Sequence, residues 1–118
     1  MMRPSGDIAV YLHRQPVDFR KAINGLSLIV QDELQMNPYD EAFFVFINRT
    51  RNRLKVLYWE RNGFCLWLKR LEKNKFSWPS KHTSDTVCIS TQELNWLLDG
   101  FDIWRMPPHQ RLFYQSVG

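Results

Sequence analysis

The chain has 118 residues, which is the length of one ordinary domain and too short for two independent hydrophobic cores. Hydrophobic residues make up 44% of the chain and aromatic residues 14%, a composition that excludes an intrinsically disordered protein. The formal net charge is +4, and five scattered glycines and six scattered prolines exclude collagen-like and low-complexity sequences.

No segment of the sequence has the pattern of a membrane span or a secretory signal. The longest apolar run covers residues 42–47, against about 20 residues for a membrane-spanning helix. The first residues lack an apolar stretch and a cleavage site, so we expect a cytoplasmic protein. Cys65 and Cys88 are far apart, which predicts neither a disulfide framework nor a zinc cluster.

The first third of the chain predicts one strand and one amphipathic helix. Residues 8–12 form a β-branched and aromatic run that is typical of a strand. Over residues 19–34, apolar side chains recur every three or four positions, which predicts a helix that ends near Gln35, before an Asn-Pro pair. Asp18 precedes this pattern, and we expect its carboxylate to cap the helix N-terminus.

Three strand-like runs follow, over residues 43–48, 53–61 and 64–71, and turn residues join them into a predicted antiparallel meander. The pair Asn62-Gly63 is a strong hairpin signal, because both residues tolerate the positive φ angles of a type I′ turn. A turn centred there would place Lys55 opposite Arg70, a like-charge pair that an anion across it would stabilise.

The predicted pairing leaves apolar side chains on both faces of the sheet. One face carries Val56, Tyr58, Cys65 and Trp67, and the other carries Leu57, Trp59, Phe64, Leu66 and Leu68. Both faces need cover, because exposed apolar surface of that extent is unfavourable. The amphipathic helix can cover one face, and the other needs the C-terminal helix, a second copy or another protein.

The C-terminal third predicts a short strand over residues 87–89 and a short helix that begins at the capping box from Ser90 to Glu93. The whole pattern predicts an α+β fold: an antiparallel β-meander of about four to five strands, one amphipathic helix packed on a face, and a short C-terminal helix. We expect a single domain over residues 1–105 and a flexible or loosely packed tail over residues 106–118.

The positive charge is concentrated in residues 49–81, which hold ten Lys or Arg against two acidic residues, whereas the rest of the chain is net negative. Such a distribution is typical of a surface that binds a polyanion. The alternative is a solvated sheet edge whose cations prevent pairing with other chains. Three arginines lie in residues 48–53, between two strands, and arginine forks bind phosphates with two hydrogen bonds.

The sequence therefore provides two sets of candidate site residues. The candidate nucleic-acid-binding residues are Arg20, Lys21, Arg49, Arg51, Arg53, Lys55, Arg61, Lys69, Arg70, Lys73 and Lys75. The candidate base-stacking or partner-binding residues are Trp59, Trp67 and Trp78. The alternative for each ring is a place in the core.

Catalytic chemistry has little support in the sequence. A metal-dependent strand transferase or nuclease needs carboxylates on its first and neighbouring strands, and the first predicted strand has none. His82 with Asp85 matches no zinc module, and no glycine-rich phosphate loop is present. We predict no catalytic residue, metal or cofactor, and keep a small metal-dependent nuclease as the weakest alternative.

Three blocks carry a resemblance to a known family: PVDFRKAINGL, FFVFINRTRNRLKVLYWERNGFCLWLKRLEKNKFSWP and ISTQELNWLLDGFD. Together they resemble the small TnpB accessory proteins of the insertion sequence 66 family of bacterial transposable elements, from about Val10 to Trp104. These are unrelated to the much longer RNA-guided nuclease of the same name. The resemblance implies a protein that acts in transposition beside a separate transposase and other accessory proteins, in a family for which no enzymatic activity is established, and we expect no enzyme.

These observations lead to one hypothesis and one main alternative. The hypothesis is an accessory protein whose basic hairpin face binds DNA, at element ends or without sequence specificity, and supports the transposase complex. The alternative is an adaptor that docks on the transposase, or on a second copy as a homodimer, through the second apolar sheet face and does not bind DNA itself.

Overall fold

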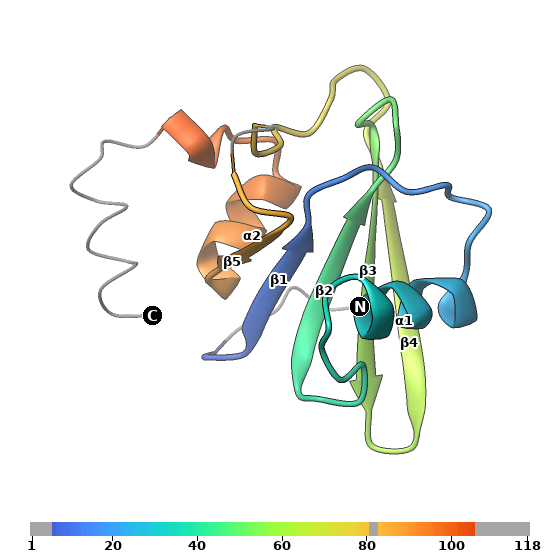
Figure 1. Ribbon diagram of the computed structural model, residues 1–118. Helices are drawn as coiled ribbons and strands as arrows, with labels where there is room; N and C mark the ends of the chain where they lie inside the picture. The colour runs from blue at the N-terminus through green and yellow to red at the C-terminus, as the bar shows by residue number, and fades with distance from the viewer. Residues whose placement is uncertain (1–5, 81–82, 106–118) are drawn as a thin grey trace.

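A five-stranded sheet lies between two helices in the computed structural model, which describes residues 6–80 and 83–105 (Figure 1). The elements are β1 (Ala9–His13), α1 (Ile23–Asp32), β2 (Ala42–Ile47), β3 (Arg53–Glu60), β4 (Gly63–Arg70), β5 (Thr86–Ile89), α2 (Thr91–Leu98) and the 3-10 turn η1 (Ile103–Arg105). The predicted α+β class is confirmed. The predicted tail over residues 106–118 lies outside the described residues, among which no helix is long and apolar enough to cross a membrane.

The strands follow the order β4-β3-β2-β1-β5 across the sheet. β2, β3 and β4 form the predicted antiparallel meander, and β5 is antiparallel to β1. β1, in contrast, runs parallel to β2, so the sheet is mixed. The reason is the connection: α1 lies between β1 and β2, and a chain that crosses one face as a helix returns to the sheet in the starting direction.

The β3–β4 turn differs from the prediction. Glu60 faces Gly63, so Arg61 and Asn62 are the turn residues, and Arg61 takes the positive φ of 53°. The expected turn at Asn62-Gly63 is therefore wrong by one position, and the pairing shifts by two residues. The shift places Trp59 directly opposite Phe64, with ring centroids 5.0 Å apart, and such an aromatic pair outweighs the local turn preference.

A two-residue shift leaves each side chain on its predicted face, and both faces are indeed apolar. On one face, α1 packs Leu26, Ile29 and Val30 against the sheet. On the other face, α2 packs Leu94, Leu97 and Leu98, joined by Phe76 and Trp78 from the segment after β4. The C-terminal helix is thus the cover that the second face needs.

The capping box of α2 is confirmed. The Ser90 hydroxyl accepts a hydrogen bond from the Glu93 backbone N–H at 3.0 Å, and the Glu93 carboxylate accepts one from the Ser90 N–H at 3.0 Å. This reciprocal arrangement satisfies two N–H groups that a helix start leaves without partners, which explains why the sequence marks this helix start well.

The predicted start of α1 is wrong, because the helix begins at Ile23 and Asp18 does not cap it. The Asp18 carboxylate instead accepts hydrogen bonds from the backbone and the guanidinium of Arg20. The backbone carbonyls of Phe19 and Lys21 accept hydrogen bonds from the Lys55 ammonium at 2.9 and 2.8 Å. A distant lysine thus takes the carbonyls that the first helical turn would have used.

Candidate nucleic-acid interface

Two loops rich in cations meet at one end of the sheet, where β2 passes into β3 and where β4 ends. The Leu71 N–H donates to the Asn52 carbonyl at 2.9 Å, and the Phe76 N–H donates to the Arg51 carbonyl at 2.7 Å. Residues 72–75 are therefore held at both ends against the β2–β3 turn. In Figure 1 these loops lie together at the top of the sheet, while the β3–β4 turn lies at the bottom.

We call this region the cationic end. It consists of Arg49, Arg51, Arg53, Arg70, Lys73 and Lys75, all of them exposed. Arg53 and Arg70 face each other directly across β3 and β4. The predicted like-charge pair of Lys55 and Arg70 is wrong, because Lys55 faces Leu68; the two-residue shift puts Arg53 in the place of Lys55.

Side-chain hydrogen bonds centred on Asn48 order the β2–β3 turn. The Asn48 side-chain oxygen accepts from the backbone N–H groups of Asn52 and Arg53 at 3.1 and 3.0 Å. The Asn48 amide nitrogen donates to Thr50 Oγ1 at 3.1 Å and to Asn52 Oδ1 at 2.8 Å. These bonds hold Arg51 at a positive φ of 61° and fix the direction in which the turn projects its arginines.

The charge at this end is only partly neutralised. The Arg70 guanidinium forms an ion pair with Glu72 at 3.0 Å, between two exposed side chains. The other five cations of the cationic end form no ion pair with any residue that the structure describes. Like charges held this close repel one another, and a bound polyanion relieves that repulsion.

Two of the predicted nucleic-acid-binding lysines have structural roles instead. The Lys55 ammonium bonds to the two carbonyls before α1 and lies 4.8 Å from the centroid of the Phe19 ring. Burial lowers the pKa of Lys55. The Lys69 ammonium donates to the Leu98 carbonyl at 2.8 Å, at the C-terminal end of α2, where a cation is favourable.

We predict that Lys55→Met lowers the free energy of unfolding by about 2 kcal/mol, because two carbonyls lose a charged hydrogen-bond donor. Urea denaturation followed by circular dichroism measures the change. Lys75→Met is the matched control, since the Lys75 side chain is exposed and forms no ion pair within the described chain. A loss of stability as large in the control as in Lys55→Met would contradict the assigned role of Lys55.

The remaining candidates lie apart from the cationic end or are already paired. The Arg20 side chain is 92% exposed, but its guanidinium bonds to Asp18, and this contact lowers the pKa of the Asp18 carboxyl to about 2. Lys21 lines a cavity beside α1. Arg61 lies at the opposite end of the β3–β4 hairpin, ~25 Å away for eight residues of strand.

None of the three candidate tryptophans joins the cationic end. Trp59 lies near the β3–β4 turn, in edge-to-face contact with Tyr39 and Phe64 at centroid distances of 4.9 and 5.0 Å. Trp67 packs half-buried on the face that α2 covers. Trp78 is buried, and its indole N–H donates to the Arg14 carbonyl at 2.6 Å. For Trp67 and Trp78 the structure thus supports the core alternative.

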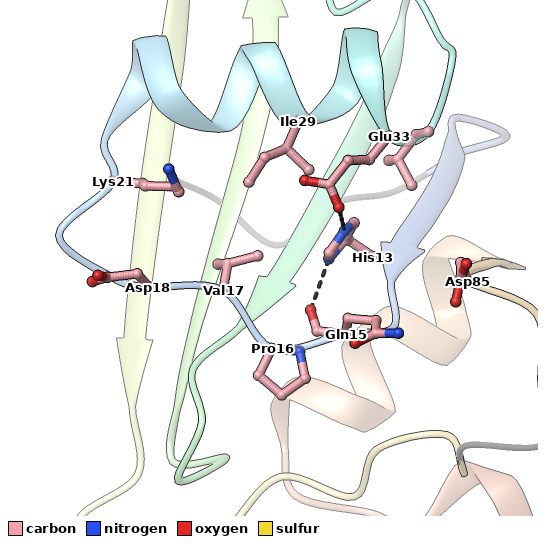
Figure 2. A pocket seen from close by; sticks show the side chains of 10 residues that line it. His13, Gln15, Pro16, Val17, Asp18, Lys21, Ile29, Glu33 and Asp85 are labelled. Carbon is pink, nitrogen blue, oxygen red and sulfur yellow. Dashed lines mark hydrogen bonds and ion pairs between the residues drawn. The ribbon is translucent and has the colours of Figure 1, made fainter.

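A cavity of about 450 Å³ lies between α1 and the end of β1, and the sequence did not indicate it (Figure 2). His13 is buried beside it, with Nδ1 2.7 Å from the Gln15 carbonyl oxygen and Nε2 3.1 Å from Glu33 Oε1. A carbonyl oxygen only accepts, so Nδ1 donates to it. His13 and Glu33 are 20 positions apart, and only the tertiary structure pairs them.

Carboxylates of Asp18 and Asp85 also line this cavity. Among the residues that the structure describes, no group of three or more His, Cys, Asp or Glu side chains is close enough to hold a metal ion. The arrangement ties the end of β1 to the end of α1 through His13, and we assign it a structural role.

Comparison with known proteins agrees with the sequence blocks quoted above. A family model described as "IS66 Orf2 like protein" matches residues 8–108, which include every element from β1 to η1. The chain belongs to this family. The predicted resemblance to the accessory proteins of the insertion sequence 66 family is confirmed, and membership indicates an accessory role in transposition.

Two relatives come from Sinorhizobium fredii. The uncharacterized protein y4hO is 39% identical over 107 residues, which cover 90% of this chain and 91% of the relative. The uncharacterized protein y4jC is 35% identical over 106 residues, 90% of each chain. No solved structure matches the chain. Both loops of the cationic end lie inside the region that the family model matches.

Proposed function

We propose that this IS66 Orf2-like protein is a non-catalytic DNA-binding accessory protein of insertion sequence transposition. In this proposal the cationic end binds the phosphates of element DNA and supports the assembly of the transposase complex there. The main support is the group of five exposed cations, unpaired within the described chain, on two loops that backbone hydrogen bonds hold together.

The chemistry of the cationic end favours the DNA backbone over the bases. Arginine guanidinium groups bind phosphate oxygens with two hydrogen bonds, and lysines add charge without fixed geometry. Each phosphate neutralised releases condensed counterions, so binding should weaken steeply with salt. Base stacking on single strands needs aromatic rings beside the cations, and the candidate tryptophans lie elsewhere. A duplex is therefore the preferred ligand.

Fluorescence anisotropy of the full-length protein tests this proposal. A labelled duplex from the terminal repeat of the element is compared with a scrambled duplex and a single strand across a salt series. We expect salt-sensitive binding to both duplexes that is tighter than binding to the single strand. A preference for the terminal repeat would add end recognition, whereas no binding at moderate salt would reject DNA binding and favour an adaptor.

The adaptor hypothesis was based on a second apolar sheet face without cover. In the structure, α2 and the segment after β4 occupy that face. The observation that motivated docking of the transposase on this face is thus accounted for within the chain. We propose that the transposase meets this protein at the cationic end, when both are bound to the same DNA.

A further inference from the structure

The outer edge of β4 is available for pairing. β4 is the last strand of the sheet, and no other strand of the described chain pairs with its outer side. It is eight residues long and has no proline, whereas β5 at the other edge has only four residues. Natural sheets protect long edges with prolines, bulges or charges along the strand, and alternate backbone groups of an unprotected edge can pair with another strand.

The side chains of β4 make this edge apolar for most of its length. Phe64, Leu66 and Leu68 follow one another on the face that α1 covers, and Leu68 is 53% exposed. Next to Phe64 lie Trp59 and Tyr39, and Tyr39 is 56% exposed. The apolar row ends at Arg70, so the strand is aromatic at one end and cationic at the other.

We propose that β4 pairs antiparallel with β4 of a second copy of the chain, which gives a homodimer with one continuous ten-stranded sheet. The two copies are related by a two-fold axis normal to the sheet at Leu66, so that Leu66 of one copy lies opposite Leu66 of the other and Phe64 opposite Leu68. In this arrangement the apolar row of one copy lies beside that of the other, and both α1 helices lie on the same side of the sheet.

The charge distribution along β4 favours a second copy of β4 as the pairing strand, and it favours the antiparallel direction for that pairing. Antiparallel pairing about Leu66 sets Arg70 of each copy diagonally across from Phe64 of the other, whose ring contacts Trp59, so a guanidinium can lie over aromatic rings. It also separates the two cationic ends by most of the length of the strand. Parallel pairing would set Arg70 against Arg70 and bring the cationic ends together, which is unfavourable.

The proposal does not depend on DNA binding, because dimer formation is measured without DNA. Analytical ultracentrifugation of the full-length protein should show a dimer at micromolar concentration. Leu68→Lys should weaken dimerisation at least about tenfold without a change in circular dichroism, because it places two unpaired cations in the interface of each dimer. Leu28→Lys is the matched control, with a leucine that is 54% exposed on α1 rather than on the edge.

The direction of pairing is tested by cysteine cross-linking in a Cys65→Ser, Cys88→Ser background. Leu66→Cys lies near the two-fold axis and should form an intermolecular disulfide on mild oxidation, whereas Arg70→Cys should not. Parallel pairing would cross-link both variants and overturn the antiparallel arrangement.

A monomeric wild type, or equal weakening by Leu68→Lys and Leu28→Lys, would overturn the dimer. If that monomer also had β4 amides protected from hydrogen exchange, another segment of the chain would be covering the edge.

Discussion

Replacing Arg49, Arg51 and Arg53 together by alanine should lower the affinity for duplex DNA at least about tenfold near physiological salt. The three side chains are exposed, belong to the ordered β2–β3 turn and form no ion pair within the described chain. Each phosphate contact contributes about 0.9 to the slope of log affinity against log salt, so the slope should fall by up to about 2.7. Anisotropy titrations across a salt series measure both quantities.

The control for this variant is Arg61→Ala with Arg105→Ala, which also lowers the net charge. Arg61 lies at the opposite end of the β3–β4 hairpin, and Arg105 pairs with Asp102 after α2. We expect the control to keep most of the affinity and nearly all of the salt slope. If the control lost as much as the triple variant, binding would follow net charge alone, and the cationic end would not be the site.

Asn48→Ala should weaken DNA binding several-fold although every cation remains. The alanine removes four side-chain hydrogen bonds from the turn and leaves backbone N–H groups of Asn52 and Arg53 without their acceptor. We expect a loss of about 1–3 kcal/mol in the free energy of unfolding, together with a lower affinity, because arginines on a disordered turn lose entropy on binding. Chemical denaturation and anisotropy measure the two effects.

Asn37→Ala is the matched control for that prediction. The Asn37 side-chain oxygen accepts from the Tyr39 backbone N–H at 2.9 Å, so it also orders a turn, but one before β2 and away from the cationic end. The loss of this hydrogen bond should lower the free energy of unfolding and leave the affinity for DNA unchanged. An Asn48→Ala protein that is destabilised but binds DNA like the wild type would show that the order of the turn is irrelevant to binding.

Much of the fold was predictable because local signals agree with the tertiary packing. The capping box at Ser90 works through bonds within one helical turn, so sequence alone marks it. The alternation of apolar residues along β3 and β4 fixes the two faces, and it tolerates the two-residue shift in pairing. The need for cover on both faces followed from the same alternation.

The errors arise where a distant contact outweighs a local preference. Lys55 takes the carbonyls before α1 and moves the helix start from Phe19 to Ile23. The contact between Trp59 and Phe64 moves the hairpin turn. The direction of β1 depends on where α1 crosses the sheet, which the periodicity of the helix does not encode.

The sequence indicated which segment holds the cations of the candidate site, but not which of those cations are exposed together. Charge density alone indicated residues 49–81, and the two loops of the cationic end come from that segment. Sequence could not separate the cations that project into solvent from Lys55 and Lys69, which bond to carbonyls 34 to 36 and 29 positions away. The pairing of His13 with Glu33 was hidden for the same reason.

The most direct test of the central claim is a map of the DNA contacts on the protein. Nitrogen-15-labelled protein is titrated with a short duplex, and the backbone amide shifts are followed by NMR. We predict that the largest shifts fall in residues 48–53 and 71–76, the two loops of the cationic end. Shifts centred on residues 59–64, at the opposite end of the hairpin, or no shifts at low salt, would contradict the proposed site.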